Sequence, residues 1–436
     1  MTLATQPYKG ARDFYPEDKR LQNYMFSVMR QTVERFGYEE YDAPILEPIE
    51  LYAAKSGIEI VNEQTYVFED RGGRRVAIRP EMTPTVSRMV AARRQELAYP
   101  LRWYSIPNLW RYERPQRGRL REHWQLNVDL FGLEGLTAEA EIIQTADAIL
   151  KNLGATHDMY TIKLNSRKLI DYIMQDYLKV DDVQAQTLIK LIDRMHKMEH
   201  SAFVAEVDAM FNPSQREAGA SNKLLGLLKI KQIEHLPEVI REHPAARQLQ
   251  ELIKLLHDAR ITNVVFDSSL MRGFDYYTDI VFEVFDKHPD NNRSMFGGGR
   301  YDGLVGLFGV DPVPTIGFGM GDVTLQNFLE VHDLVPALRP GTDLYVVLIG
   351  DVYAKAQAVI ADLREMGLNV AVDSTGRKAD KQIKAAAKKG LHYAMFIGEK
   401  ELGDELYEIR NLLTGVSERH SAARIVGIVK DYREDL

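Results

Sequence analysis

One apolar run near the middle of the chain constrains the fold more than any other stretch. It reads MRGFDYYTDIVFEVF and extends from Met271 to Phe285. Aromatic and β-branched residues at this density predict a buried strand. An arginine and a glycine precede the strand, and Asp275, Tyr276 and Tyr277 stand at its beginning. Two structures fit this pattern: an edge strand with a solvated arginine, or a strand whose polar end meets a ligand.

The composition restricts the class of protein. Hydrophobic residues make up 45% and charged residues 27% of the 436 residues, which is ordinary for a globular protein of two to four domains. No apolar run approaches the roughly 18 residues that a membrane span needs. The N-terminus lacks the apolar segment of a secretory signal. The absence of cysteine excludes disulfides, thiolate nucleophiles and cysteine-containing zinc sites, and it suits a reducing cytoplasm.

The basic residues are unevenly distributed. The net charge of −8 argues against a nucleic-acid partner when taken alone. However, one short stretch contains five arginines, which are Arg111, Arg114, Arg117, Arg119 and Arg121. A second stretch, from Arg377 to Lys389, contains six basic residues and one acidic residue. Local basic patches of this kind matter more for binding a polyanion than the overall charge does.

Two segments in the first hundred residues allow alternative interpretations. A helical period over 21–36 is followed by an extended run in which Pro44 and Pro48 stand four residues apart. Such prolines belong at a sheet edge, at an interface or in a loop. Further along, Glu81 and Thr83 lie where a predicted strand gives way to a helix. These two side chains can bind one ammonium group together, or they can cap the helix N-terminus.

A polar loop and an alternating strand occupy residues 108–132. The loop reads RPQRGR and lies between two predicted strands. The second strand alternates between apolar and polar residues, and its polar face carries Gln125, Asn127 and Asp129. Exposed strand faces favour Thr, Lys and Arg over Asn and Asp. We therefore expect this face to hydrogen-bond a small ligand.

Leucine-rich segments with a helical period replace the strand pattern from about 166 to 260, which predicts a helical insertion in the first domain. The insertion contains an H-x-x-E-H pattern made by His196, Glu199 and His200. On one helix this pattern places two imidazoles four residues apart, as in an inverted zinc-peptidase motif. A zinc site also needs a third ligand, and no companion motif is evident. A solvated helix face is therefore the preferred interpretation, and no metal held by a protein motif is predicted.

Glycine-rich segments and a regular C-terminal pattern complete the chain. Three glycines precede Arg300 and Tyr301, and they allow either a turn or a close approach of the backbone to a ligand. Their spacing matches neither a Walker loop nor a dinucleotide fingerprint. After Pro340 and Gly341, strands and helices alternate as βαβαβ. This period predicts a separate small α/β domain over 340–436.

In this order, the segments resemble the histidyl-tRNA synthetases, which are class II aminoacyl-tRNA synthetases. The resemblance is carried by RGFDYYT, by GGGRYDG, and by three segments similar to the class II motifs around Pro44, from Asn108 to Gly132 and from Pro314. It implies an α/β protein whose catalytic domain, over 1–335, has an antiparallel sheet flanked by helices and the insertion at about 166–260. The domain over 340–436 resembles an anticodon-binding domain.

The resemblance implies a histidine–tRNA ligase. Such an enzyme uses ATP and Mg²⁺ to convert L-histidine to histidyl-adenylate, which it transfers to the 3′ end of tRNA(His). A cytoplasmic homodimer with no membrane partner is expected. The alternative is a non-catalytic, histidine-sensing or regulatory paralogue of the same fold. Its support is Thr324, which stands where family members usually carry an arginine for the γ-phosphate. Arg114, Arg119 and Arg121 are the candidates to reach the ATP tail instead.

The resemblance also implies roles for single residues. Arg111 and Arg272 are the expected catalytic cations, because two anions meet when a carboxylate attacks the α-phosphate. The expected histidine-binding residues are Glu81, Met82, Thr83, Arg111, Gln125, Asp129, Arg272, Tyr276, Tyr277 and Tyr301. The expected ATP-binding residues are Arg111, Glu113, Arg119, Arg121 and Gly321. The expected tRNA-binding residues are Gln116, Arg377, Lys381 and Lys384.

The last three of these residues belong to a basic helix of the C-terminal domain. A basic helix face is either solvated or in contact with phosphate. The helical period places Ile383, Ala387 and Leu391 on the buried side of this helix.

Overall fold

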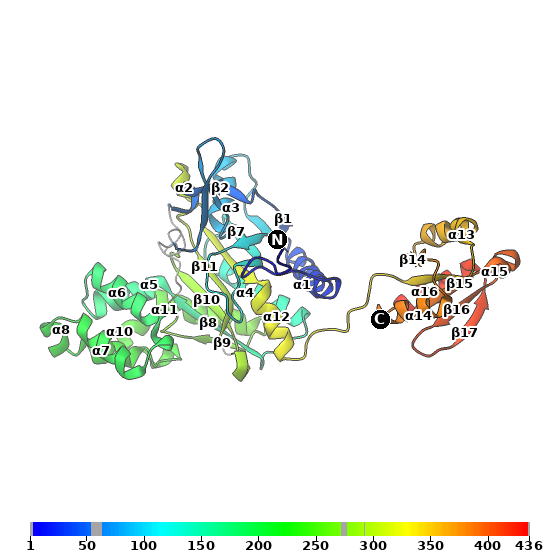
Figure 1. Ribbon diagram of the computed structural model, residues 1–436. Helices are drawn as coiled ribbons and strands as arrows, with labels where there is room; N and C mark the ends of the chain where they lie inside the picture. Colours follow the sequence, from blue (N-terminus) through cyan, green and yellow to red (C-terminus); the bar gives the residue numbers. More distant parts are fainter. Residues whose placement is uncertain (1–2, 54–62, 272–276, 292, 435–436) are drawn as a thin grey trace. The chain divides into compact units, whose positions relative to one another are not determined.

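The computed structural model describes residues 3–53, 63–271, 277–291 and 293–434 (Figure 1). The chain divides into two compact units. The larger unit contains Met1–Asp13 and Gln22–Val335, and the smaller unit contains Phe14–Leu21 and Pro336–Leu436. None of the helices in the described ranges combines the length and the apolar character that crossing a membrane requires.

The main sheet of the larger unit is antiparallel over most of its width. Within the described residues it has nine strands in the order β1-β5-β7-β12-β11-β10-β8-β9, with β6 paired to β7. The strands are β1 (Glu39–Glu40), β5 (Leu101–Ser105), β6 (Asn108–Trp110), β7 (Glu122–Phe131), β8 (Tyr160–Ser166), β9 (Val264–Phe266), β10 (Ile280–Asp286), β11 (Ser294–Arg300) and β12 (Thr315–Gly321). The pairs β1–β5 and β8–β9 are parallel. This sheet, flanked by helices, confirms the predicted fold class.

The central apolar run forms β10, which lies between β8 and β11. The alternative of an edge strand is therefore wrong. Ile280, Val281, Phe282 and Val284 are all buried, because both faces of a central strand are covered. The strand begins at Ile280, so Tyr277 precedes it.

The larger unit contains α2 (Ile49–Ala53), α3 (Thr83–Ala92), α4 (Leu136–Asn152), α12 (Asp322–Val331) and most of α1 (Pro16–Arg35), whose first residues belong to the smaller unit. Helices α3, α4 and α12 pack on strands of the main sheet, whereas α2 contacts the strands Leu46–Pro48 and Arg75–Ile78. In α4, the buried positions Ile142, Ile143, Ala146, Ile149 and Leu150 recur at helical spacing. This stripe faces β7 and β12, so the helix covers the strands at the centre of the sheet.

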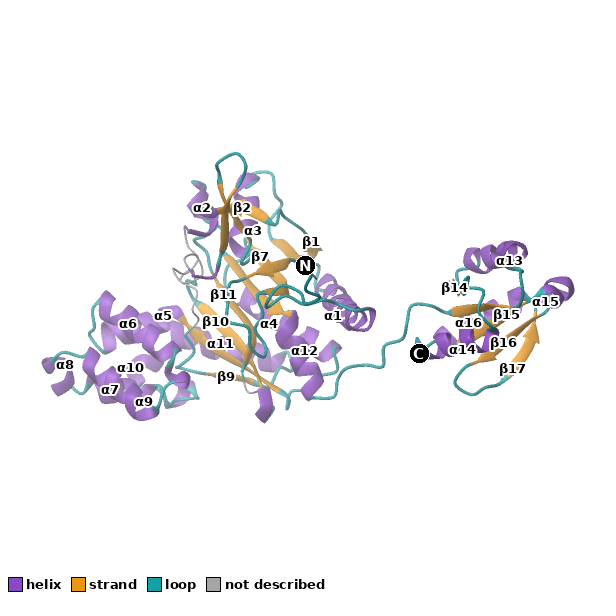
Figure 2. Ribbon diagram, in the orientation of Figure 1, coloured by secondary structure: helices purple, strands orange, loops and turns teal. Residues whose placement is uncertain are grey.

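The segment between β8 and β9 forms a group of helices beside the sheet (Figure 2). It contains α5 (Arg167–Tyr172), η2 (Ile173–Tyr177), α6 (Asp182–Asp193), η3 (Met195–Lys197), α7 (His200–Met210), α8 (Pro213–Glu217), α9 (Ala220–Leu227), η4 (Ile233–His235), α10 (Glu238–Arg241) and α11 (Pro244–Asp258). Helix α11 has His243 as its N-cap and a proline in its first turn, and it packs against α4, β8 and β9. The last helix of the insertion thus fastens the group to the sheet.

The H-x-x-E-H pattern does not lie on one helix. His196 belongs to the short turn η3, Glu199 precedes α7, and His200 is the first residue of α7. Met198 between them has an extended backbone, with φ −120° and ψ 154°. The expected helix face is therefore wrong, and the two imidazoles lack the spacing that the zinc-peptidase motif requires.

A second, three-stranded sheet in the larger unit has the order β2-β4-β3. Its strands are β2 (Leu46–Pro48), β3 (Tyr66–Glu69) and β4 (Arg75–Ile78). Pro48 lies in β2, at the edge of this sheet, where a missing backbone N–H leaves no ladder bond unmade.

The smaller unit is an α/β domain with the sheet order β14-β13-β15-β16-β17. Its elements are β13 (Leu344–Leu348), α13 (Tyr353–Glu365), β14 (Val370–Val372), α14 (Ala379–Lys388), β15 (Tyr393–Ile397), α15 (Glu399–Asp404), β16 (Tyr407–Asn411), β17 (Ser417–His420) and α16 (Ala422–Glu434). The first three strands are parallel, as the βαβαβ pattern predicts, and β16 and β17 add an antiparallel hairpin.

The expected buried side of α14 is confirmed at Leu391 and Ile383, which pack in the core of this domain, but it is wrong at Ala387, which is exposed. Ala386 and Gln382 are buried instead. The side-chain amide of Gln382 accepts a hydrogen bond from the backbone N–H of Leu348 at 3.0 Å and donates one to its carbonyl at 2.9 Å. A polar side chain therefore joins the helix to β13, and hydrophobic periodicity alone does not reveal such an inward-facing glutamine.

A substitution at Gly298 tests the close packing of β11 against β12. A Cβ atom there would lie 2.0 Å from the carbonyl oxygen of Gly317 and 2.7 Å from the Cα atom of Phe318. Because backbone atoms cannot move aside cheaply, we expect Gly298→Ala to lower the free energy of unfolding by roughly 1–3 kcal/mol in urea denaturation. Gly226→Ala is the control, because nothing lies within 4 Å of the added atom. Equal stability of the two variants would contradict the packing.

Candidate active site

A cavity of about 510 Å³ lies on one face of the main sheet. Strands β7, β10, β11 and β12, the start of α3 and the loop between β6 and β7 all contribute to it. Most of the expected site residues that the structure describes in the larger unit line it, and they are Glu81, Thr83, Arg111, Glu113, Gln116, Arg119, Gln125, Asp129, Tyr277, Tyr301 and Gly321. Residues more than 200 positions apart in the sequence therefore share one cavity.

The floor of the cavity consists of glycines in the two middle strands. The strand register places Asn127 opposite Gly319, Gly319 opposite Gly297, and Gly297 opposite Glu283. These four residues lie on one face of the sheet, and all of them line the cavity. A flat ligand can therefore lie against bare backbone between an amide on β7 and a carboxylate on β10.

Polar side chains occupy the space above the floor. A Cβ atom at Gly317 would lie 2.6 Å from Oδ1 of Asp129 and 2.7 Å from the hydroxyl oxygen of Tyr301. A Cβ atom at Gly319 would lie 2.8–3.0 Å from the side-chain amide of Gln125. Gly317 and Gly319 are therefore required, because the side chains of Asp129, Tyr301 and Gln125 occupy the space that a Cβ atom would need.

Asp129 has one occupied and one unoccupied carboxylate oxygen. The hydroxyl of Tyr301 donates a hydrogen bond to Oδ1. Oδ2 accepts no hydrogen bond from any residue that the structure describes. Burial raises the pKa of Asp129 to about 7, against the opposing effects of the Tyr301 hydroxyl and of the nearby buried Tyr41 hydroxyl. A ligand N–H at Oδ2 would satisfy this acceptor and favour its charged form.

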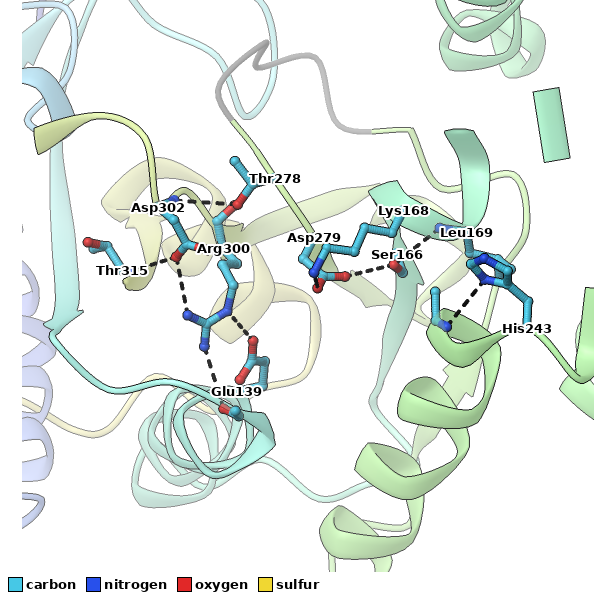
Figure 3. A network of polar contacts seen from close by, with 12 residues as sticks. Glu139, Ser166, Lys168, Leu169, His243, Thr278, Asp279, Arg300, Asp302 and Thr315 are labelled. Carbon is cyan, nitrogen blue, oxygen red and sulfur yellow. Dashed lines mark hydrogen bonds and ion pairs between the residues drawn. The ribbon is translucent and has the colours of Figure 1, made fainter. Parts of the chain in front are cut away.

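A polar network holds the backbone near the two cavity tyrosines (Figure 3). Nε of Arg300 lies 2.5 Å from Oε1 of Glu139, and both side chains are buried. The same guanidinium reaches Asp302 at 3.2 Å. The carbonyl oxygen of Arg300 accepts a hydrogen bond from the N–H of Thr278 at 2.7 Å. The residues next to Tyr277 and on both sides of Tyr301 are thus fastened by one ion-pair cluster.

The same view shows how the insertion is joined to β10 (Figure 3). Asp279, directly before the strand, accepts a hydrogen bond from the Ser166 hydroxyl at 2.8 Å. Its other oxygen lies 2.6 Å from Nζ of Lys168, in the first turn of α5. The backbone that follows Tyr277 is thereby tied to the beginning of the helical insertion.

The loop between β6 and β7 is a tight hairpin. The backbone groups of Gln116 and Arg119 exchange two hydrogen bonds of 2.9 Å, and Gly118 at the turn has a φ of +75°. Arg119 forms an ion pair with Glu113 at 3.0 Å. At the base of the loop, Nε of Arg111 donates to the carbonyl oxygen of Pro80 at 2.9 Å. This bond directs the guanidinium of Arg111 to the cavity wall that carries Glu81.

Two expected site residues do not line the cavity. The guanidinium of Arg121 lies 3.9 Å from the ring centroid of Tyr112 and donates to the Tyr8 hydroxyl at 3.0 Å. It is therefore held between two tyrosines as a structural group. Met82 is fully buried, and it contributes to the core beneath the start of α3. Neither side chain is among those that line the cavity.

The remaining expected residues lie elsewhere. Arg272 and Tyr276 fall outside the described residues. Arg377, Lys381 and Lys384 belong to the smaller unit.

Several cavity residues were not foreseen from the sequence as site residues. Glu283, Arg117 and Arg293 line the cavity, and so do Asp193 and Lys197 from the insertion. Glu283 is the single carboxylate within the apolar strand VFEVF, and this pattern could have indicated a site residue. The two insertion residues gave no signal, because only tertiary packing decides which side of the insertion meets the cavity.

Comparisons with known proteins agree with this geometry. Residues 10–323 match the family model described as histidyl-tRNA synthetase, and residues 343–432 match the one described as anticodon binding domain. The chain is 45% identical over 412 residues to a histidine–tRNA ligase of Leptospira biflexa, with 94% of each chain covered. It is 37% identical over 423 residues to that of Thermoplasma volcanium, covering 94% of this chain and 95% of the relative.

A solved structure has the same fold over nearly the whole length. The crystal structure of histidyl-tRNA synthetase from Nostoc sp. PCC 7120 superimposes with a TM-score of 0.82 at 23% identity. The match covers 99% of this chain and all of the other.

The protonation of Asp129 predicts a pH-dependent stability. An unfolded aspartate has a pKa of about 3.9, whereas burial raises that of Asp129 to about 7. Between these values the native carboxyl holds a proton that the unfolded chain has released. Its contribution to stability is therefore complete below about pH 4 and is lost as the pH rises to about 7.

The measurement is urea denaturation of the wild type and of Asp129→Asn from pH 4 to pH 7. We expect the difference in their free energies of unfolding to fall with rising pH, by at most about 1.4 kcal/mol per pH unit. Tyr301→Phe removes a hydrogen bond that favours the charged form, so it should move this window to higher pH. A difference that does not change with pH would contradict the raised pKa.

Proposed function

The chain belongs to the histidyl-tRNA synthetase family and is a ligase that joins histidine to tRNA, and from this premise we propose which of its side chains carry each step. The observation that supports the assignment is the cavity that these residues share, which has a carboxylate and two amides on β7 and arginines in the adjoining loops. The relatives compared above are histidine–tRNA ligases, and they give the regulatory alternative no support.

The reaction joins two anions before it forms the ester. A carboxylate oxygen of histidine attacks the α-phosphorus of ATP, the bond to the bridging oxygen breaks, and pyrophosphate leaves with the electron pair. A ribose hydroxyl of the terminal tRNA nucleotide then attacks the carbonyl carbon, and AMP leaves. Positioning and the offset of negative charge therefore provide most of the catalysis.

We assign the histidine ammonium group to Glu81, Thr83 and Gln125, which line one side of the cavity. The imidazole ring donates to Oδ2 of Asp129, the buried oxygen without a described partner, and meets the hydroxyl of Tyr277. Tyr301 holds Asp129 in place through Oδ1. A pocket that pairs both ring nitrogens rejects amino acids without them by a factor on the order of 10⁴.

Arg111 is the cation for the α-phosphate, because Pro80 holds its guanidinium at the cavity. The roles of Arg272 as a second cation and of Tyr276 in the histidine pocket rest on the resemblance alone. Arg272→Ala should lower the rate of adenylate formation and leave the histidine affinity less affected, which single-turnover kinetics measure. A normal rate would exclude Arg272.

We assign ATP to Glu113, Arg119 and Gly321, which line the cavity. Mg²⁺ is usually held by one or two carboxylates together with the substrate phosphates. Glu113 and Glu283 are carboxylates that line the cavity, and the described residues offer no group of three ligands. This donor set fits an ion carried mainly by ATP. When bound, the ion neutralises part of the charge on the phosphates.

The acceptor end of tRNA(His) is assigned to Gln116, in the hairpin at the cavity mouth. In the smaller unit, Lys381 and Lys384 are exposed on α14, whereas Arg377 is paired with the buried Asp373 at 2.5 Å. The two lysines are therefore the better phosphate contacts. Replacing both with alanine should weaken tRNA binding and reduce its salt dependence, as filter binding at several salt concentrations measures. An unchanged dependence would exclude them.

We further propose a homodimer in the cytoplasm, the compartment that suits a chain without cysteine. Ile45, Leu46 and Phe68 are exposed apolar side chains on or beside the three-stranded sheet. Contact with a second copy of the chain would bury these three side chains and remove their apolar surface from water. Sedimentation of the full chain measures this state, and a monomer at micromolar concentration would contradict it.

The first experiment is histidine-dependent exchange of pyrophosphate into ATP without tRNA. We expect exchange by the wild type with L-histidine and not with other amino acids. Arg111→Ala should lower the exchange rate by about 10² or more, because a cation at the α-phosphate is lost. Arg71→Ala, at an exposed turn outside the cavity, is the control. Histidine binding without exchange would contradict the ligase and favour the regulatory alternative.

A glycine substitution tests the ammonium contact. The three atoms nearest to a Cβ atom at Gly319 all belong to the flexible amide of Gln125, at 2.8–3.0 Å, so Gly319→Ala would displace that amide. We expect the KM for histidine to rise about 10- to 100-fold, the loss of one hydrogen bond to a charged group, with the KM for ATP unchanged. Gly341→Ala, with nothing within 4 Å of the added atom, is the control. A normal KM for histidine in Gly319→Ala would exclude Gln125 from the ammonium site.

A further inference from the structure

Two loops far apart in the sequence meet at the cavity through arginine side chains. Arg117 lies in the hairpin between β6 and β7, and Arg293 lies between β10 and β11. Nη1 of Arg293 donates to the carbonyl oxygen of Arg117 at 3.2 Å. Nη1 of Arg117 donates to the carbonyl oxygen of Asp290 at 3.3 Å. These reciprocal contacts place both guanidinium groups beside the same cavity, which both residues line.

Neither of these arginines has its charge compensated by a described carboxylate. Their hydrogen-bond partners are backbone carbonyls, and both side chains are exposed. A guanidinium has five N–H donors, so each retains donors for another acceptor. The other arginines of the hairpin differ in position or in partner. Arg119 is paired with Glu113, Arg121 is stacked on a tyrosine outside the cavity, and Arg114 does not line the cavity.

Thr324 lies under the tip of the hairpin. Its hydroxyl is directed to the carbonyl oxygens of Met295 at 2.8 Å and Gly321 at 3.1 Å. Its methyl carbon would lie 3.6 Å from a Cβ atom at Gly118. The short side chain at this position thus allows the hairpin to close onto α12, and this closure brings Arg117 next to Arg293.

We propose that Arg117 and Arg293 together bind the β- and γ-phosphates of ATP and the departing pyrophosphate. The inference rests on the proposed function. Phosphate oxygens accept the remaining N–H groups of both guanidinium ions in charge-assisted hydrogen bonds. The two cations come from separate loops, so the polyphosphate is held from two sides. This pair supplies the positive charge that Thr324 does not.

A purely structural role, in which the two arginines only join the loops, predicts a different result. Loss of the contacts between the two loops would alter the conformation of both loops and weaken the binding of every nucleotide. Loss of a phosphate contact affects only ligands with β- and γ-phosphates. AMP, which shares the adenosine and the α-phosphate with ATP, therefore distinguishes the two roles.

The test is histidine-dependent pyrophosphate exchange by the full chain with Arg117→Ala, Arg293→Ala and the double variant. We expect the KM values for ATP and for pyrophosphate to rise at least tenfold in each single variant. The inhibition constant of AMP and the KM for histidine should stay within twofold of the wild type. Arg293→Lys should recover part of the loss, and Arg71→Ala is again the control.

Two results would overturn this inference. One is a KM for ATP within twofold of the wild type in the double variant. The other is an AMP inhibition constant that rises as much as the KM for ATP, because the arginines would then act on the loops and not on the phosphates. Failure of the wild type to exchange at all would count against the proposed function itself, so the two failures are distinguishable.

Discussion

The close approach of β11 and β12 is the constraint on which the rest of the structure depends. A Cβ atom at Gly298 would lie 2.0 Å from the backbone of β12, and one at Gly317 would lie 2.5 Å from the backbone of β7. Three strands can approach this closely only where side chains are absent. Gly317 and Gly319 also leave the floor of the cavity bare beneath Asp129, Tyr301 and Gln125. Gly298 is paired with Phe318 and does not line the cavity. It therefore serves the packing of the sheet, whereas Gly317 serves both the packing and the site.

Different kinds of element supply the polar groups of the cavity. Strands carry the groups that we assign to the amino acid, such as Asp129 on β7, which accepts a buried hydrogen bond from Tyr301. Loops carry the cations, such as Arg117 and Arg293, which are held through backbone carbonyls. This division suits the reaction, because amino-acid selection needs fixed geometry, whereas a polyphosphate must enter and leave as pyrophosphate.

The sequence predicted the secondary-structure elements and the polar face of β7. It did not predict which residues contact a given side chain. Alternation in β7 was sufficient to place Gln125 and Asp129 on one face, because the period of a strand is a local property. The position of Arg121 was not predictable in the same way. Its guanidinium is held by Tyr8 and Tyr112, and the first of these partners is 113 residues away. Adjacent arginines in one loop therefore have unrelated environments.

By itself, the sequence determined the fold class, the order of the elements and the residue types of the site, since periodicity, glycines and prolines act over a few neighbouring residues. Only the tertiary structure decided that β10 is a central strand, that Glu283 faces the glycine floor, and that the loops of Arg117 and Arg293 meet. These facts follow from strand register and from the closing of one loop on another. They depend on contacts between segments as far as 176 residues apart, and no local pattern encodes which distant segments come together.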